Sequence, residues 1–66
     1  MNPTERSIKT EEIQIERKSF VFDLRENDRG RFLRITENTG HKRDIIMIPA
    51  PGLEDFRRCI VAMLSA

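Results

Sequence analysis

Apolar and polar residues alternate along residues 20–35, and this alternation constrains the fold of the chain more than any other feature. Five apolar residues recur at every second position on either side of a turn-forming Asn-Asp-Arg-Gly sequence at positions 27–30. They are Phe20, Phe22, Leu24, Leu33 and Ile35. A period of two interrupted by turn residues is typical of a β-hairpin with one buried face. The stretch therefore predicts two antiparallel strands joined by a short turn.

Phe32 breaks this pattern, because the pleat of the second strand sends it to the face opposite the apolar set. Arg34 and Thr36 follow it on that face, and Arg31 precedes it in the sequence. An aromatic ring on a solvated strand can stack on a nucleobase, while flanking cations neutralise phosphates. The pattern predicts a strand surface that binds nucleic acid. The residues alone leave open that Phe32 is an incidental exposed aromatic or a contact of a partner chain.

The charge of the chain is balanced overall but uneven along the sequence. The net charge is +1 and 35% of the residues are charged, which argues against the generic electrostatic binding of histone-like proteins. Three arginines and no acid lie between positions 29 and 34, which predicts a basic patch. Alternatively, the arginines pair across strands with Asp23, Glu26 and Glu37, at about 0.2–1 kcal/mol for each pair.

The length of 66 residues limits the chain to one domain that needs a partner. A domain of this size buries only about 60% of the surface of its unfolded chain. Cys59 is the only cysteine, and with His41 it makes too few ligands for a structural zinc site, so neither a disulfide nor a metal can stabilise the fold. Oligomerisation therefore remains as the way to stabilise the fold. A lone thiol without a secretion signal predicts a cytoplasmic protein, either free or associated with the nucleoid.

The first part of the chain predicts an arm followed by a strand. Residues 1–10 are mostly polar, and we expect them to form a flexible N-terminal arm or the start of a strand, ahead of a single domain over residues 11–66. Ile13 and Ile15 alternate with polar residues, but they occupy odd positions whereas the later apolar set occupies even ones. A turn or bulge near Arg17 and Lys18 is needed to bring both sets to one face.

The last part of the chain predicts a fourth strand and a helix. Residues 44–48 contain the apolar, isoleucine-rich run of residues 45–48, although the buried face of this strand is not evident, and the two prolines of residues 49–52 end the sheet. The following residues have helical spacing, and every residue from 59 to 64 is apolar, so a second chain is needed to cover them. We expect the residues of the core and dimer contact to be Phe56, Ile60, Met63 and Leu64. The predicted fold class is α+β, with a four-stranded antiparallel sheet followed by one C-terminal helix.

Chemistry of other kinds is not indicated. No apolar run approaches the roughly 20 residues that span a bilayer, so we expect no membrane partner. His41 lies in a predicted loop without a second histidine, and Cys59 has no neighbouring base in the sequence. Glu54 and Asp55 are explained by the helix dipole, which favours acids in the first turn. We therefore expect no enzymatic activity, no cofactor, no metal and no small-molecule substrate.

Two segments of the sequence resemble the PUR repeat, the module of purine-rich-element-binding proteins. They are RKSFVFDLRENDRGRFLRITE, with its Arg-Gly-Arg-Phe-Leu sequence, and GLEDFRRCI at the start of the helix. The resemblance spans about residues 13–64. It implies a strand-strand-strand-strand-helix repeat that intertwines with a second repeat, each adding its helix to a joint core. Because this sequence contains one repeat, pairing between two chains is implied, as a homodimer of the short bacterial type.

The resemblance also implies a function and a set of site residues. The family binds single-stranded DNA and RNA, with a preference for purine-rich and G-rich sequence. The positions that match its binding surface are Lys18, Arg25, Asn27, Arg31, Phe32 and Arg34. Arg25 and Arg34 would neutralise phosphates, Asn27 would bond a base edge and Phe32 would stack. The alternative from another class is a dimeric protein-interaction module that recognises an acidic segment of a partner.

Overall fold

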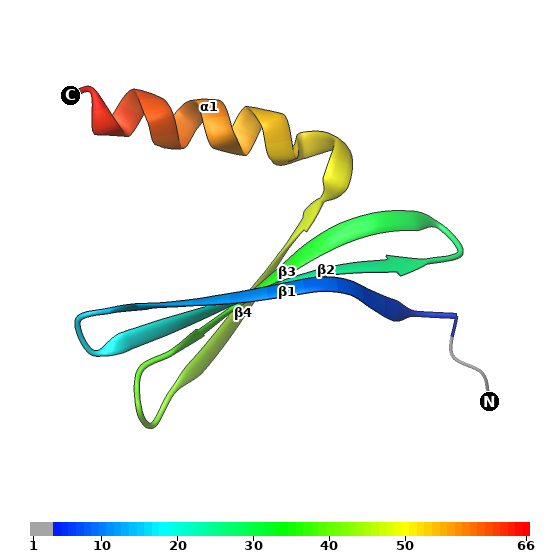
Figure 1. Cartoon of the computed structure of the whole chain (residues 1–66), viewed down its shortest axis with the longest axis horizontal. Helices are drawn as coiled ribbons and strands as arrows, with labels where there is room; N and C mark the ends of the chain where they lie inside the picture. Colours follow the sequence, from blue (N-terminus) through cyan, green and yellow to red (C-terminus); the bar gives the residue numbers. More distant parts are fainter. Residues whose placement is uncertain (1–3) are drawn as a thin grey trace.

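The computed structural model describes residues 4–66 and contains one sheet and one helix (Figure 1). In chain order the elements are β1 (Arg6–Ile15), β2 (Lys18–Asn27), β3 (Gly30–Asn38), β4 (Arg43–Pro49), the short 3-10 turn η1 (Ala50–Gly52) and α1 (Leu53–Leu64). The strands pair antiparallel in the order β1-β2-β3-β4, so each strand neighbours the next along the chain. The predicted four-stranded antiparallel sheet followed by one C-terminal helix is confirmed.

The change of parity between the first two strands is resolved by a two-residue turn. Glu16 and Arg17 connect β1 to β2, and Glu16 adopts a positive φ of 56°. This turn sets Ile13 directly opposite Phe20, and directly opposed residues of an antiparallel pair point to the same face. The odd and even apolar sets therefore share one face, as the sequence required. The β2–β3 turn is equally short and ends at Gly30, whose φ of 131° favours glycine.

The structure moves the N-terminal boundary of the sheet. β1 begins at Arg6, so residues 6–10 lie in a strand, which is the second of the two alternatives stated for residues 1–10, and not in a flexible arm. Backbone pairing with β2 explains the difference, because a ladder needs no apolar side chains: Arg6 pairs with Glu26, and the register shifts between Ser7 and Lys9. The rest of the arm prediction falls partly on residues 1–3, which lie outside the described residues.

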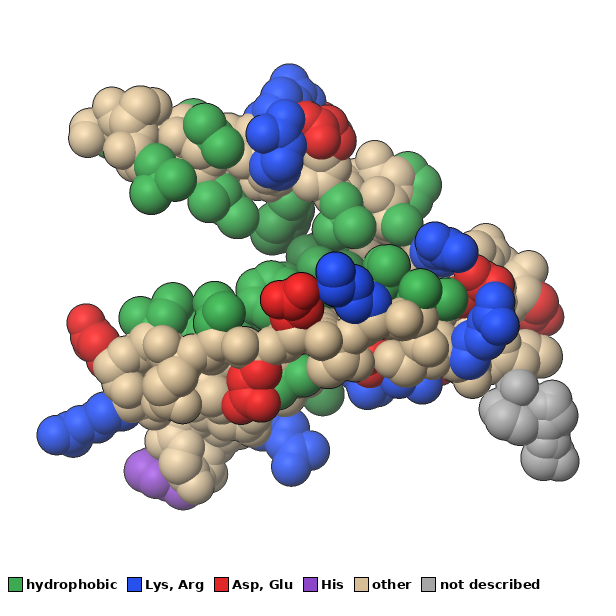
Figure 2. All heavy atoms as spheres, in the orientation of Figure 1, with side chains coloured by type: hydrophobic (Ala, Val, Ile, Leu, Met, Phe, Trp, Pro, Cys, Tyr) green, Lys and Arg blue, Asp and Glu red, His purple; other side chains and the backbone are tan. Residues whose placement is uncertain are grey.

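The two faces of the sheet have different chemistry, and we name them by their residues. The apolar face carries Ile13, Ile15, Phe20, Phe22, Leu24, Leu33, Ile35, Ile46 and Ile48. The open face carries Thr10, Val21, Asp23, Arg25, Phe32, Arg34, Thr36, Ile45 and Met47. In Figure 2 a row of hydrophobic side chains lies along the side of the sheet toward α1. The register thus answers the question left by the sequence of β4, whose Ile46 and Ile48 belong to the apolar face.

Helix α1 extends over the apolar face without closing onto it. η1 contacts both β3 and α1, and from this junction the helix rises away from the sheet (Figure 1). Figure 2 shows a wedge-shaped opening between the two, with hydrophobic side chains on both sides. Among the described residues Ile48, 7% exposed, is the only buried hydrophobic side chain, whereas Ile46 is 51% exposed and Ile60 56%. One chain therefore leaves most of its apolar surface uncovered.

Candidate nucleic-acid interface

The centre of the open face is formed by side chains from β2 and β3 that the register places next to one another. Arg34 lies directly opposite Asp23, and Phe32 lies directly opposite Arg25. Cross-strand neighbours on one face have their Cβ atoms about 4.5–5.5 Å apart, so these four side chains form one continuous surface. The predicted juxtaposition of Phe32 with Arg25 and Arg34 on one face is therefore present in the structure.

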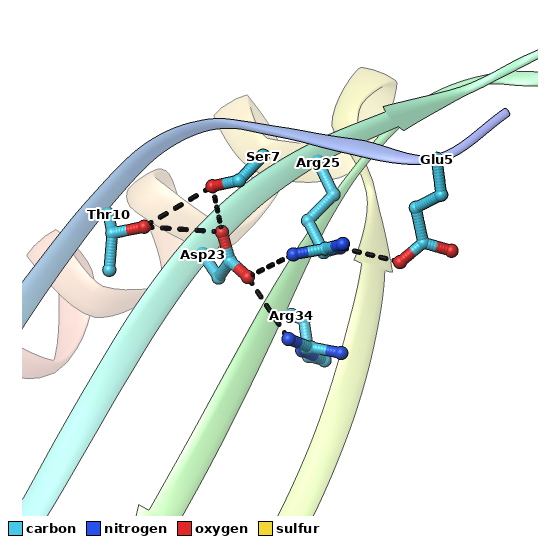
Figure 3. A network of polar contacts seen from close by, with 6 residues as sticks. All are labelled: Glu5, Ser7, Thr10, Asp23, Arg25 and Arg34. Carbon is cyan, nitrogen blue, oxygen red and sulfur yellow. Dashed lines mark hydrogen bonds and ion pairs between the residues drawn. The ribbon is translucent and has the colours of Figure 1, made fainter. Parts of the chain in front are cut away.

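Asp23 organises this surface, and the sequence analysis did not assign it that role. Its Oδ2 accepts a hydrogen bond from Arg25 Nη1 at 2.7 Å and another from Arg34 Nη2 at 3.1 Å. Its Oδ1 accepts from Ser7 Oγ at 2.7 Å and from Thr10 Oγ1 at 3.3 Å (Figure 3). Asp23 is only 8% exposed, so this carboxylate is a buried acceptor whose charge is matched by two arginines.

These contacts favour the ionised form of the carboxyl group and the protonated form of the arginine. The hydrogen bond from Ser7 lowers the pKa of Asp23, and Arg25 lowers it further by hydrogen bonding and charge. The hydrogen bond to Asp23 raises the pKa of Arg25, and the bond to Glu5 raises it as well. The network therefore holds fixed charges at neutral pH.

Arg25 also contacts a second acid. Its Nε donates to Glu5 Oε2 at 2.5 Å, so one guanidinium lies between Glu5 and Asp23 (Figure 3). Glu5 precedes β1, and its side chain is 40% exposed, against 11% for Asp23. The two carboxylates on Arg25 therefore differ in how firmly the surrounding protein encloses them.

Phe32 lies at the edge of a hollow next to the Asp23 network. It is half-buried, less exposed than the sequence suggested, because Arg25 lies opposite it on β2 and Pro49 on β4. The hollow has a volume of about 430 Å³. Its lining residues are Glu5, Asn27, Arg29, Gly30, Arg31, Phe32, Met47 and Pro49. An aromatic ring, an apolar thioether and several polar groups thus border a space of the size of a small ligand.

The β2–β3 turn contributes Asn27 and a further arginine. Asn27 Oδ1 accepts a hydrogen bond from the backbone N–H of Arg29 at 2.9 Å, which fixes the turn. Arg29 borders the hollow, and within residues 4–66 it forms no ion pair with a carboxylate. Sequence reasoning used Arg29 only as a turn residue. Its place two residues after Asn27, at the tip of a hairpin with a basic face, is the signal that could have identified it.

Two predicted site residues lie on the other face. Lys18 and Arg31 point with the apolar face, because their register partners are Ile15 and Glu26. Lys18 Nζ lies 3.0 Å from Glu37, and Arg31 Nε donates to Glu26 at 2.8 Å. Sequence neighbours on a strand point to opposite sides, so Arg31 cannot share the face of Phe32 although it borders the hollow. The structure thus corrects the grouping of Lys18 and Arg31 with the open face.

The predicted contact residues of the helix share one side of α1. Phe56, Ile60 and Met63 line an apolar hollow of about 340 Å³ together with Cys59 and Asp55. Leu64 is 81% exposed at the end of the helix. In the first half of the helix the opposite side is polar, with i,i+3 ion pairs of Glu54 with Arg57 and of Asp55 with Arg58.

Other functional groups are sparse in the part of the chain that the structure describes. Residues 4–66 contain no group of three or more His, Cys, Asp or Glu side chains that could hold a metal ion. None of their helices has the length and apolar character needed to cross a membrane. The arrangement on the open face can bind anions through guanidinium groups and planar groups through an aromatic ring.

Comparisons with known proteins agree with this chemistry. The family model described as "PurA ssDNA and RNA-binding protein" matches residues 1–66. The chain is 48% identical over 44 residues to "Transcription factor Pur-alpha 1" of Arabidopsis thaliana, covering 67% of this chain and 15% of that protein. It is 38% identical over 67 residues to "Transcriptional activator protein Pur-alpha" of Homo sapiens, covering 91% of this chain and 21% of that protein. The chain thus spans about a fifth of the length of the curated relatives it matches.

Proposed function

Since this chain belongs to the family of PurA single-stranded DNA- and RNA-binding proteins, we propose that it binds single-stranded nucleic acid through the open face of its sheet. One observation carries the proposal: Arg25, Phe32 and Arg34 are adjacent on a face that the helix leaves free. Single-strand binding needs cations along the backbone of the strand and a ring on which a base can stack. The open face supplies both.

Each side chain of this surface has a distinct role in the proposal. Phe32 stacks on a base that enters the hollow, and its half-buried position keeps the ring in one orientation. Arg25 and Arg34 bind phosphates on either side. Asn27 has its Oδ1 engaged by the turn, so its Nδ2 is the group that donates to a base edge. Arg29, at the rim of the same hollow, adds a third cation.

The proposed binding unit is a homodimer that buries the apolar face. The second chain fills the opening between α1 and the sheet, where Ile46, Ile60 and Met63 are between 51% and 71% exposed. Water-exposed surface of this kind is unfavourable by about 25 cal/mol per Å², and no single-chain contact removes it here. Exchange of helices between two chains would cover both apolar regions and leave both open faces free.

The proposed preference is for purine-rich sequence. It rests on family relationship, because relatives such as "Purine-rich element-binding protein gamma" of Homo sapiens carry that preference in their name. The larger two-ring purines also stack more strongly on an aromatic side chain than pyrimidines do, which fits a site with one ring.

Direct titration tests the proposed function. The sequence contains no Trp and no Tyr, so nucleic acid that co-purifies is visible by its absorbance. We expect a labelled purine single strand to bind in fluorescence anisotropy more tightly than a pyrimidine strand, and binding to weaken as salt is raised. An acidic peptide serves as the comparison for the protein-interaction alternative. Binding of that peptide in place of every single strand tested would contradict the proposal.

A further inference from the structure

Two carboxylates contact the same guanidinium on the open face, and they differ in burial, in number of partners and in place in the chain. Asp23 comes from the middle of β2, accepts four hydrogen bonds and is 11% exposed at its side chain. Glu5 precedes β1, contacts Arg25 through one hydrogen bond and is 40% exposed at its side chain. This difference indicates that the two acids respond differently when an anion approaches Arg25: one keeps its contact and the other gives it up.

The geometry of Arg25 defines where a phosphate can bind. A guanidinium binds an oxyanion in two-point fashion through the edge formed by Nε and Nη2 or the edge formed by Nη1 and Nη2. Asp23 accepts one N–H of Nη1 at 2.7 Å, and this contact fixes the orientation of the guanidinium. Glu5 occupies Nε at 2.5 Å, which blocks the first edge. Because Nε has a single N–H, a phosphate gains two-point contact through Nε and Nη2 only by replacing Glu5.

The charges and contacts of this cluster also indicate that Glu5, and not Asp23, is the carboxylate that a phosphate replaces. Arg25 and Arg34 contribute two positive charges, and Asp23 and Glu5 contribute two negative ones, so the cluster is neutral as it stands. Removing Asp23 would break the bonds that fix both arginines and would leave Ser7 and Thr10 without their acceptor. Removing Glu5 breaks one partly exposed ion pair, a type of contact that contributes little to stability.

We propose that Asp23 is a positioning residue that holds Arg25 and Arg34 for phosphates, and that Glu5 occupies the phosphate position on Arg25 until a nucleic-acid strand displaces it. The inference rests on the proposed function and adds a mechanism to it. The displaced group also borders the hollow beside Phe32, so the same movement of Glu5 clears Arg25 and widens access for a base.

Two substitutions of equal charge separate this inference from simple electrostatics. Glu5→Gln and Asp23→Asn each remove one negative charge and raise the net charge of the chain from +1 to +2. If only charge mattered, both would tighten binding. The inference predicts opposite signs: Glu5→Gln tightens binding about two- to fivefold, and Asp23→Asn weakens it at least about threefold. Glu12→Gln, an equal charge change farther along β1, is the matched control and gives a smaller change than either.

The binding experiment uses a labelled purine DNA strand of about ten nucleotides, within the range of known single-strand site sizes. Dissociation constants are compared by anisotropy at one fixed salt concentration, and circular dichroism and dimer mass are recorded for each variant. Because Asp23→Asn could impair folding, Ser7→Ala provides a second route: it removes a hydrogen bond to Asp23 without changing charge and should also weaken binding.

NMR spectroscopy reports on the position of the Arg25 side chain independently of binding affinity. In wild-type protein the Arg25 Nε–H is hydrogen-bonded to Glu5 and its guanidinium is fixed by Asp23, so a distinct side-chain NMR signal is expected. Glu5→Gln should shift that signal in the way that addition of the strand does. Asp23→Asn or Ser7→Ala should broaden it.

The outcomes distinguish the inference from its premise. Opposite signs for Glu5→Gln and Asp23→Asn, with the NMR changes described, support the inference. Binding by the wild-type protein with equal tightening in both variants, or with no effect of Glu5→Gln beyond that of Glu12→Gln, would overturn it and leave the proposed function intact. Absence of any single-strand binding by the wild-type dimer would overturn the proposed function and the inference with it.

Discussion

The two faces of the sheet differ in how much of their bonding is completed within one chain. On the open face Asp23 is 8% exposed and accepts four hydrogen bonds, and none of the buried side-chain N and O atoms in the described residues lacks a partner. On the apolar face Ile48 is the one buried hydrophobic side chain of the described residues, and large side chains on the facing helix remain exposed.

This contrast indicates that the open face is suited to a ligand and the apolar face to another protein chain. The contacts of Asp23 hold Arg25 and Arg34 in place before any ligand arrives, and such preorganisation lowers the ordering cost of binding. An apolar surface of this extent is unfavourable in water, and we propose that a second copy of the chain covers it. Folding and dimerisation are therefore expected to be one event, with ligand binding a later and separable one.

Disrupting the helix contact should have the largest effect. Ile60→Asp places a charge in the apolar hollow of α1, and an unpaired buried charge costs several kcal/mol, so we expect loss of the folded dimer. Light scattering and circular dichroism would measure it. The control is Arg58→Asp, which puts the same side chain on the polar side of the helix and should cost no more than about 1 kcal/mol. A folded dimer of Ile60→Asp would refute the shared core.

Removing the ring on the open face should weaken ligand binding and leave assembly unchanged. Phe32→Ala removes base stacking, for which we expect a loss of roughly 1–3 kcal/mol in binding to a purine single strand. Anisotropy titration measures the loss, with dimer mass as the check on assembly. Ile45→Ala is the matched control, because Ile45 is 49% exposed on the same face but does not border the hollow. Equal binding by Phe32→Ala and wild type would contradict the stacking role.

The salt dependence of binding should show which face of the sheet contacts the phosphates. Arg34→Ala removes one proposed phosphate contact, so the slope of log K against log salt should fall in magnitude by about 0.7. Lys18→Ala makes the same charge change on the apolar face, where Lys18 is paired with Glu37, and should alter the slope less. Equal slopes for the two variants would mean that the open face is not where phosphates bind.

Acid should lower the free energy of unfolding by protonating Asp23, and this is the smallest of the expected effects. Ser7 and Arg25 lower the pKa of Asp23 in the folded protein below its value in the unfolded chain. The ionised carboxylate therefore stabilises the fold at neutral pH, and that contribution is lost as pH falls below about 4 and through the folded pKa. The free energy of unfolding of Asp23→Asn should fall less over this range than that of wild type. Asp28→Asn, in the exposed β2–β3 turn, should follow wild type, and an identical pH profile for all three proteins would contradict the role of Asp23.

The elements of the fold could be predicted because their signals are local. The alternation around residues 20–35 and the helical spacing after residue 52 both appear in the structure as expected. The change of parity between Ile13 and Phe20 also required the turn that is present at Glu16 and Arg17. Such features depend on side-chain period and turn chemistry, which a sequence carries directly.

The site was only partly predictable because it depends on register and on contacts between distant residues. The pleat placed Phe32 and Arg34 on one face, and the family resemblance added Arg25. The grouping of Arg31 with them followed sequence adjacency and ignored the alternation of faces. The role of Glu5 was missed, and Asp23 was considered only as an ion-pair partner, because the bonds to Glu5, Ser7 and Thr10 join residues distant in the sequence. The alternative that the basic residues pair with Asp23, Glu26 and Glu37 describes real contacts of the structure.

Photochemical crosslinking tests most directly whether nucleic acid lies on the open face. The chain has four phenylalanines and no Trp or Tyr, and of the four only Phe32 lies on the open face, whereas Phe20 and Phe22 lie on the apolar face and Phe56 on the helix opposite it. A purine single strand that carries one iodouracil is bound to the protein and irradiated. Mass spectrometry of the crosslinked product then identifies the aromatic ring that contacts a base. We predict a crosslink at Phe32. Crosslinks at Phe20, Phe22 or Phe56 with none at Phe32 would contradict the account.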